Sequence, residues 1–270
     1  MELKHQRVCM AKVYTIASGK GGTGKTTTTI NLGTSLAEMG HRTTVLDADL
    51  GMANLGLLLG LEEEPVTLHE VLSGDQRIKN AIYEGPEGLQ VVPAGLTLEG
   101  FQKADPEKLQ DALSYIIDNT EYLLIDAPAG LSKDSVIPLA VADEVLLVVN
   151  PELSSMADGL KTRVMTDKVG SEVGGIVLTR AGSAADDLDV SRVEDLLEAE
   201  VLVSVPEDAE VRRSASYKKP VVLHSPNSPA SQAYKKLAHK ITDEEFVEEV
   251  PTGEGEDDGF VNKMAKAIFG

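Results

Sequence analysis

The chain has 270 residues, which is enough for one α/β domain with a complete hydrophobic core. Its 44 acidic residues outnumber 25 basic ones, and the net charge of −19 repels polyanions and argues against DNA as a partner. The single cysteine, Cys9, excludes an intrachain disulfide, and no apolar run is long enough to cross a membrane. We therefore expect a cytoplasmic protein. Its acidity is also typical of proteins from a salt-rich cytoplasm, which favours a haloarchaeal source.

Short apolar runs alternate with helical patterns along most of the chain. The expected strands are 12–18, 43–47, 89–93, 122–126, 144–149, 175–179 and 201–205. The expected helices are 26–39, 106–119, 155–169 and 190–198. Nearly continuous apolar strands that alternate with helices predict a three-layer α/β/α domain with a mainly parallel sheet. We place this domain at residues 12–242, after a leader of residues 1–11 in which either Met1 or Met10 is the native start.

The segment Gly19–Thr26 reads G-K-G-G-T-G-K-T and matches the phosphate-loop pattern G-x-x-x-x-G-K-[ST]. It follows an apolar strand and opens a helix, so its backbone N–H groups and the helix dipole can bind phosphate oxygens. Lys25 is expected to reach the β- and γ-phosphates, and the Thr26 hydroxyl is expected to bind Mg²⁺. A glycine-rich turn before an ordinary helix is the structural alternative. The residues expected to contact the phosphates are Lys20, Gly21, Gly22, Thr23, Gly24, Lys25, Thr26 and Thr27.

A second lysine, Lys20, directly follows the first glycine of the loop. In this feature the sequence resembles the MinD/ParA/NifH family of deviant Walker A P-loop ATPases, and the resemblance covers most of residues 12–225. It implies ATP and Mg²⁺ as cofactors and ATP hydrolysis as the activity. It also implies an ATP-dependent homodimer in which Lys20 reaches the partner's phosphates. An ordinary solvent-exposed lysine is the alternative.

Two aspartates follow expected strands. Asp49 comes two residues after the second strand, and Asp126 ends the fourth strand before A-P-A-G, a Walker B pattern. Carboxylates at strand ends lie on the ligand-binding edge of an open α/β sheet, so Asp126 is expected to accept from a Mg²⁺-bound water. The resemblance implies that Asp49 orients the attacking water or helps to hold Mg²⁺. For Asp47, a role at a helix N-terminus competes with a role in the site. The expected catalytic residues are Lys20, Lys25 and Asp49, and the expected metal residues are Thr26, Asp49 and Asp126.

Further along, V-N-P-E-L-S-S-M-A-D at 149–158 resembles the MinD branch of the family. This resemblance implies that Glu152 and Asp158 lie at the dimer interface, near the partner's nucleotide or its Lys20. Capping of the following helix is the alternative for both residues.

Two later strand ends are expected, again by resemblance, to frame adenine and ribose. The guanine-binding patterns N-K-x-D and T-K-x-D do not occur in the sequence, which favours ATP over GTP. The expected nucleoside-binding residues are Thr179, Arg180, Pro206, Glu207 and Asp208.

The C-terminal part has a different composition. Residues 243–258 are dominated by Glu and Asp with interspersed Pro and Gly, which predicts an acidic linker. Residues 259–270 form an amphipathic helix pattern, similar in position to the membrane-targeting helix of the MinD branch. Docking on its own domain, binding of a protein partner and disorder are the alternatives. The apolar face of this tail comprises Phe260, Val261, Met264 and Ile268, with Phe269 at its edge.

We therefore expect an ATPase that dimerises with ATP, cycles on and off a membrane and positions other cellular machinery, with an unidentified protein cargo or activator. A ParA-like partitioning protein would need a basic surface, which the acidity disfavours. A NifH-like carrier would need cluster-binding cysteines, which the chain lacks. A regulator of surface-appendage placement would share the mechanism and differ in its partners. The histidines have no metal-ligand spacing and are predicted to be structural: His5, His41, His69, His224 and His239.

Overall fold

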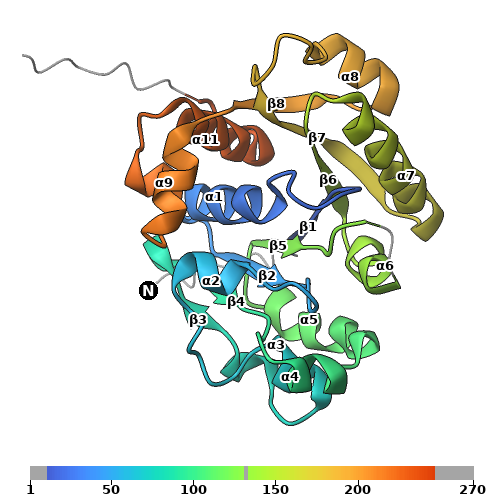
Figure 1. The fold of residues 1–270 in the computed structure, drawn as a ribbon. Coiled ribbons are helices and arrows are strands. Elements are labelled where there is room, and N and C mark those ends of the chain that lie inside the picture. Colours follow the sequence, from blue (N-terminus) through green and yellow to red (C-terminus); the bar gives the residue numbers. More distant parts are fainter. Residues whose placement is uncertain (1–10, 131–132, 247–270) are drawn as a thin grey trace, which may run out of the picture.

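The computed structural model describes residues 11–130 and 133–246 and folds them around one eight-stranded sheet (Figure 1). The strand order is β3-β4-β2-β5-β1-β6-β7-β8. All neighbouring strands are parallel except β3 and β4, which are antiparallel. β1 therefore lies in the centre of the sheet, between β5 and β6. The strands are β1 Lys12–Ala17, β2 Thr43–Asp47, β3 Tyr83–Glu84, β4 Gln90–Val92, β5 Tyr122–Asp126, β6 Glu144–Val149, β7 Glu172–Ala181 and β8 Val201–Pro206.

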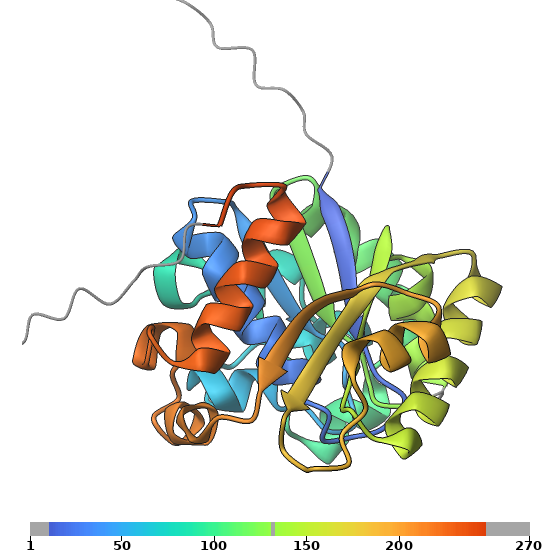
Figure 2. The same ribbon diagram turned by 90° about the horizontal axis from the view of Figure 1, so that it is seen from above.

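Helices cover both faces of this sheet. α1 and α11 lie on one face, and α5 and α7 lie on the other (Figures 1 and 2). The predicted three-layer α/β/α fold with a mainly parallel sheet is confirmed. The helices are α1 Lys25–Glu38, α2 Leu55–Leu59, α3 Leu68–Ser73, α4 Leu98–Lys103, α5 Leu109–Ile117, α6 Lys133–Ala140, α7 Leu153–Val169, α8 Val190–Leu197, α9 Ala209–Ser216, α10 Val221–His224 and α11 Pro229–Thr242. Short 3-10 turns occur at Ile78–Asn80, Pro86–Gly88 and Pro106–Lys108.

The central strands are buried on both faces, which explains their continuous apolar sequences. On β1, Tyr14 and Ile16 belong to the core under α1 and α11, whereas Val13 belongs to the core under α3 and α5. On β6, Leu146 faces the first of these cores and Leu147 faces the helices α7 and α8. Side chains alternate between the two faces of a strand, so a strand covered by helices on both sides needs apolar residues at every position.

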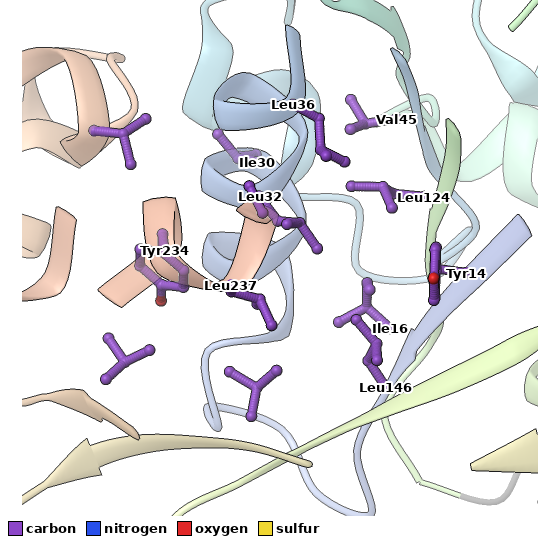
Figure 3. Close-up of a cluster of buried hydrophobic side chains, with 14 of the residues drawn as sticks. Tyr14, Ile16, Ile30, Leu32, Leu36, Val45, Leu124, Leu146, Tyr234 and Leu237 are labelled. Atoms are coloured by element: carbon purple, nitrogen blue, oxygen red, sulfur yellow. The ribbon is translucent and has the colours of Figure 1, made fainter. Parts of the chain in front are cut away.

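The core between α1, α11 and the sheet fixes the helix that follows the phosphate loop (Figure 3). Leu32 and Leu36 of α1 and Leu237 of α11 are fully buried there. Each such side chain contributes about 1.5–3 kcal/mol to the free energy of unfolding. A Cβ on Gly33 would lie 2.5 Å from Cγ1 of Val45, so only glycine allows α1 to approach β2 this closely. The position of the phosphate loop therefore depends on the packing of α1.

Several elements differ from the sequence-based expectation. The expected helix 106–119 begins as a 3-10 turn and continues as α5. β7 is longer than the expected strand 175–179 and runs from Glu172 to Ala181, with a register shift in its pairing with β6 between Val145 and Leu146. The helices α2, α3 and α4 were not predicted, since helices of five or six residues are too short to show a helical period. α6 was missed as well, and it contains Pro138, which usually ends a helix.

Within the described residues the last helix is α11, which ends at Thr242, directly before the predicted acidic linker. Most of the predicted leader, linker and tail lies outside the described residues. Among the helices that the structure describes, none is long and apolar enough to cross a membrane.

Candidate nucleotide-binding site

The phosphate loop connects β1 to α1 at the carboxyl edge of the sheet (Figure 1). Gly22 and Gly24 have φ values of 79° and 97°, in the left-handed region that glycine adopts without strain. A Cβ on Gly19 would lie 2.3 Å from backbone atoms of Asp158, so α7 packs directly against the loop. The Gly130 N–H donates to the Ser18 carbonyl at 3.0 Å. Elements far apart in the sequence thus hold the loop in one shape.

The loop leaves space and polar groups for phosphate. A Cβ on Gly21 or Gly22 would meet nothing within 4 Å, so this side of the loop is open. The buried hydroxyl of Thr23 has no hydrogen-bond partner among the described residues, as expected of a group that can serve a ligand. Lys25 is only 8% exposed and begins α1, whose N-terminal dipole favours an anion. These residues fit a nucleotide phosphate chain.

Two of the three expected metal residues, Thr26 on α1 and Asp126 at the end of β5, are in direct contact. Thr26 Oγ1 donates to Asp126 Oδ2 at 2.5 Å, and Thr29 Oγ1 donates to Asp126 Oδ1 at 3.4 Å. A hydroxyl and a carboxylate are hard oxygen ligands of the kind that Mg²⁺ prefers. Over residues 11–130 and 133–246 no group of three or more His, Cys, Asp or Glu side chains could hold a metal. The Thr26 hydroxyl and the Asp126 carboxylate fit Mg²⁺, which takes few protein ligands and completes its shell with water and phosphate.

Burial raises the pKa of Asp126 to about 6, and the nearby Asp49 adds to this, while Lys25 and the hydrogen bond from Thr26 oppose it. Burial, together with the neighbouring Asp126, also raises the pKa of Asp47 well above its usual range. The two residues are paired across β2 and β5. A cation bound between the phosphates and Asp126 would relieve this repulsion.

We expect Asp126→Asn to stabilise the metal-free, nucleotide-free protein at neutral pH. Because the folded pKa is raised to about 6, the shift costs no stability below the unfolded pKa near 4. The penalty grows as the pH rises from about 4 to about 6, and it is fully present above 6. Asparagine cannot ionise, so it removes that penalty. Urea unfolding in EDTA should show a larger gain in unfolding free energy at about pH 7.5 than at about pH 5. An equal gain at both pH values would contradict the raised pKa.

Asp47, the last residue of β2, and Asp49, two residues later, have different surroundings. The Asp47 carboxylate is buried and accepts backbone N–H groups from Asp49 at 3.0 Å and from Asn54 and Leu55 at 3.1 Å each. Leu55 is the first residue of α2, so the structure supports the interpretation of Asp47 as a residue that holds a helix N-terminus. Asp49 is partly exposed and accepts the Met52 N–H at 3.0 Å. Asp49 is thus the aspartate of this loop whose side chain is open to a ligand.

In this structure the Lys20 side chain forms its hydrogen bonds within its own chain, at the protein surface. Its Nζ donates to Glu152 Oε2 at 3.0 Å and to Ser154 Oγ at 3.2 Å. Lys20 lowers the pKa of Glu152 by this hydrogen bond and by its charge. Glu152 precedes α7 but makes no side-chain capping bond, so the capping alternative does not describe it. Asp158 flanks Gly19 and forms an ion pair with Lys161 at 3.0 Å.

A cavity of about 210 Å³ adjoins the phosphate loop. All of the residues expected to frame the nucleoside line it, together with three residues of the loop and the start of α1. Val205 of β8 and four residues of α9 and α11 complete the wall and were not predicted as site residues. The lining residues are Thr23, Gly24, Thr27, Thr179, Arg180, Val205, Pro206, Glu207, Asp208, Val211, Arg212, Ala215 and Tyr234.

The polar residues that were expected to frame the nucleoside divide into two groups. Thr179 is buried and its Oγ1 donates to the Thr23 carbonyl at 2.6 Å, so it ties β7 to the phosphate loop. Asp208 accepts the N–H groups of Glu210 at 2.9 Å and Ala230 at 3.1 Å, and so holds the starts of α9 and α11. Arg180 and Glu207 remain exposed, 3.6 Å apart, at the mouth of the cavity. Both side chains are therefore accessible to a ligand in the cavity.

A glycine loop between a strand and a helix, with an aspartate at the end of the neighbouring strand, defines a P-loop NTPase. Comparison with known proteins narrows this class. Residues 14–221 match the family model of the CobQ/CobB/MinD/ParA nucleotide binding domain. An uncharacterized ATP-binding protein of Methanocaldococcus jannaschii is 45% identical over 261 residues, which cover 97% of this chain and 98% of the relative.

Solved structures agree with this match. The cell division ATPase MinD of Pyrococcus furiosus superposes with a TM-score of 0.84 at 38% identity, covering 87% of this chain and 99% of that one. MinD of Pyrococcus horikoshii, complexed with Mg-ADP, superposes with a TM-score of 0.83 at 37% identity, covering 86% and 96%. The chain belongs to the CobQ/CobB/MinD/ParA nucleotide-binding family and is a MinD-like member of it. The magnesium nucleotide in the P. horikoshii protein agrees with the predicted cofactors, ATP and Mg²⁺.

Proposed function

We propose that this protein is an ATPase that dimerises on binding ATP, associates with a membrane as a dimer, and returns to the cytoplasm after hydrolysis. The observation that carries the proposal is Lys20, an extra lysine of the phosphate loop that lies at the surface beside α7. The P. furiosus relative is a cell division ATPase, which supports ATP hydrolysis and a role in placing cellular machinery. The cargo or activator is an unidentified protein.

In the proposed hydrolysis, water attacks the γ-phosphate in line with the leaving oxygen. Lys25 and Lys20 stabilise the charge that develops on the phosphate oxygens. Asp49 orients the water, because its carboxylate lies on the ligand edge beside Asp126. Thr26 and Asp126 would hold Mg²⁺, which when bound would supply positive charge to the phosphate oxygens.

The surroundings of Lys20 suit a switch between two partners. In the single chain its ammonium is paired with Glu152, and the two side chains are 33% and 55% exposed. Ion pairs this exposed contribute little to stability, so Lys20 can leave Glu152 and reach a second subunit at small cost. Beside Glu152, the exposed apolar side chains of Leu153, Leu160 and Val164 on α7 offer a surface for contact. We propose that Glu152 and Asp158 lie at this dimer interface.

Membrane association rests on residues 259–270, which lie outside the described residues. One amphipathic helix of this length binds a bilayer weakly, because it must also fold. Two tails on one ATP-bound dimer bind together, which strengthens the association by a factor of about 10²–10⁴. ATP would thus control membrane residence through dimerisation alone.

The proposal predicts co-sedimentation with anionic liposomes that depends on ATP. Full-length protein should sediment at least about tenfold more with ATP than with ADP, because only the dimer presents two tails. Deletion of residues 259–270 should abolish sedimentation but keep the ATP-dependent dimer in size-exclusion chromatography. Lys20→Ala should lose both the dimer and the sedimentation, because without dimerisation each chain presents only one tail to the membrane.

Two outcomes would correct the proposal. Full-length protein that dimerises with ATP but stays in the supernatant would show that the tail does not bind membranes, and would favour a tail that binds a protein partner. Retention of the ATP-bound dimer on DNA at low salt would instead favour a ParA-like partitioning protein, despite the net charge of −19.

A further inference from the structure

His69, the second residue of α3, contacts the loop that carries Asp49. The His69 side chain is buried, with 1% of the residue exposed, and its Nε2 lies 3.1 Å from the Leu50 carbonyl. A carbonyl oxygen only accepts hydrogen bonds, so Nε2 carries the hydrogen and donates it. Burial lowers the pKa of His69, which favours the neutral ring. The ring is thus a neutral donor aimed at the backbone one residue after Asp49.

The imidazole is held firmly in this orientation. Glu70 accepts the Thr67 N–H at 2.7 Å in a capping box that fixes the start of α3. On the other side, a Cβ on Gly95 would lie 2.4 Å from Nδ1 of His69, and a Cβ on Gly100 would lie 2.9 Å from it. Both glycines therefore pack against the ring, which leaves it little freedom to turn.

The contact adds a hydrogen bond in the middle of the loop, which Asp47 does not reach. Asp47 accepts the N–H of Asp49 at one end of the loop and those of Asn54 and Leu55 at the other. Between these ends, the Leu50 carbonyl is held by His69. The Asp49 carboxylate accepts the Met52 N–H, so the position of the carboxylate depends on the position of the backbone at residues 49–52. Movement of Leu50 would move that carboxylate.

We propose that His69 is a positioning residue for ATP hydrolysis, which holds the Leu50 carbonyl so that the Asp49 carboxylate faces the attacking water. The inference rests on the proposed function, in which Asp49 orients that water. A carboxylate that orients a nucleophile must be held within a fraction of an ångström, and supporting hydrogen bonds supply that precision. Packing alone does not require a histidine here, since a leucine fills a similar volume without a buried polar ring.

The test compares His69→Leu, which lacks the donor, with His69→Gln, whose Nε2 can donate from a similar position. Single-turnover hydrolysis of bound ATP with Mg²⁺ should slow about tenfold in His69→Leu, the effect of one lost hydrogen bond. His69→Gln should stay within about threefold of the wild type. ATP affinity should be unchanged in both variants, because neither contacts the phosphate loop. His239→Leu, a partly buried histidine on α11, serves as the matched control.

Asp49→Ala, measured in parallel, separates the two proposals. If Asp49→Ala hydrolyses ATP normally, the proposed role of Asp49 is wrong and the role of His69 is wrong with it. If Asp49→Ala is slow but His69→Leu is as fast as the wild type, only the inference about His69 fails. Equal slowing in His69→Leu and His69→Gln would also overturn it, because the retained donor would then have no effect. Hydrogen exchange should show faster exchange of the Leu50–Met52 amides in His69→Leu than in His69→Gln, and equal rates would contradict the proposal.

Discussion

Lys25→Ala should reduce the affinity for ATP by about 100-fold or more, the largest effect we expect from a single substitution. Lys25 is the lysine of the phosphate loop that lies buried at the first position of α1. Its ammonium can form charge-assisted hydrogen bonds to the β- and γ-phosphates, each about twice as strong as a neutral hydrogen bond. Alanine removes these bonds and also leaves the buried Asp126 without its nearest opposing charge. Both changes disfavour a bound polyanion.

Isothermal titration with ATP and Mg²⁺ measures this effect. Lys168→Ala is a suitable control, since it removes one positive charge from the exposed end of α7. A thermal unfolding curve separates loss of binding from loss of the fold. Unchanged ATP affinity in folded Lys25→Ala would show that the glycine loop does not bind phosphate.

Asp49→Ala should slow ATP hydrolysis by about 100-fold and leave ATP binding and ATP-dependent dimerisation intact. The Asp49 carboxylate lies outside the phosphate loop, in the segment between β2 and α2. Its removal therefore leaves the contacts of the loop and of Lys20 in place. The hydrolysis-deficient dimer should be longer lived and should accumulate on liposomes with ATP.

Asp49→Asn distinguishes chemistry from loop geometry. Asparagine keeps an oxygen that can accept the Met52 N–H, which the carboxylate accepts at 3.0 Å in the wild type, but it lacks the negative charge. Slowing by both variants in a single-turnover assay would indicate that the charge is needed. A fast Asp49→Asn beside a slow Asp49→Ala would indicate that Asp49 only maintains the turn. Asp186→Ala, on an exposed turn before α8, controls for the loss of an acidic residue.

The sequence was most informative where chemistry and local structure depend on neighbouring residues. The order strand, glycine loop, helix is local, and so Gly22, Gly24 and Lys25 could be placed before any fold was known. The strands β2, β5 and β6 were predicted with correct bounds, because burial on both faces leaves an unbroken apolar run. Short helices lack such a pattern, and α2, α3 and α4 were missed.

The walls of the nucleoside cavity show what needs a tertiary structure. Arg180 and Glu207 were expected through resemblance, whereas Arg212 and Tyr234 were not. α11 brings Tyr234 to the cavity by packing on α1, and neither helix carries a local sign of that contact. Such residues cannot be predicted from sequence spacing, because tertiary packing brings them to the cavity from distant parts of the chain.

By itself, the sequence determined the class of this protein, its phosphate loop and the extra Lys20, because these depend on residue types at short spacing. It left Asp47 open between two roles and treated His69 as an ordinary structural histidine. The tertiary structure decided both. It turned the Asp47 carboxylate onto the amides that lead into α2, and it brought the imidazole of His69 to the carbonyl beside Asp49. A hydrogen bond between residues 19 positions apart depends on how α3 packs under the sheet, and only the folded chain contains that information.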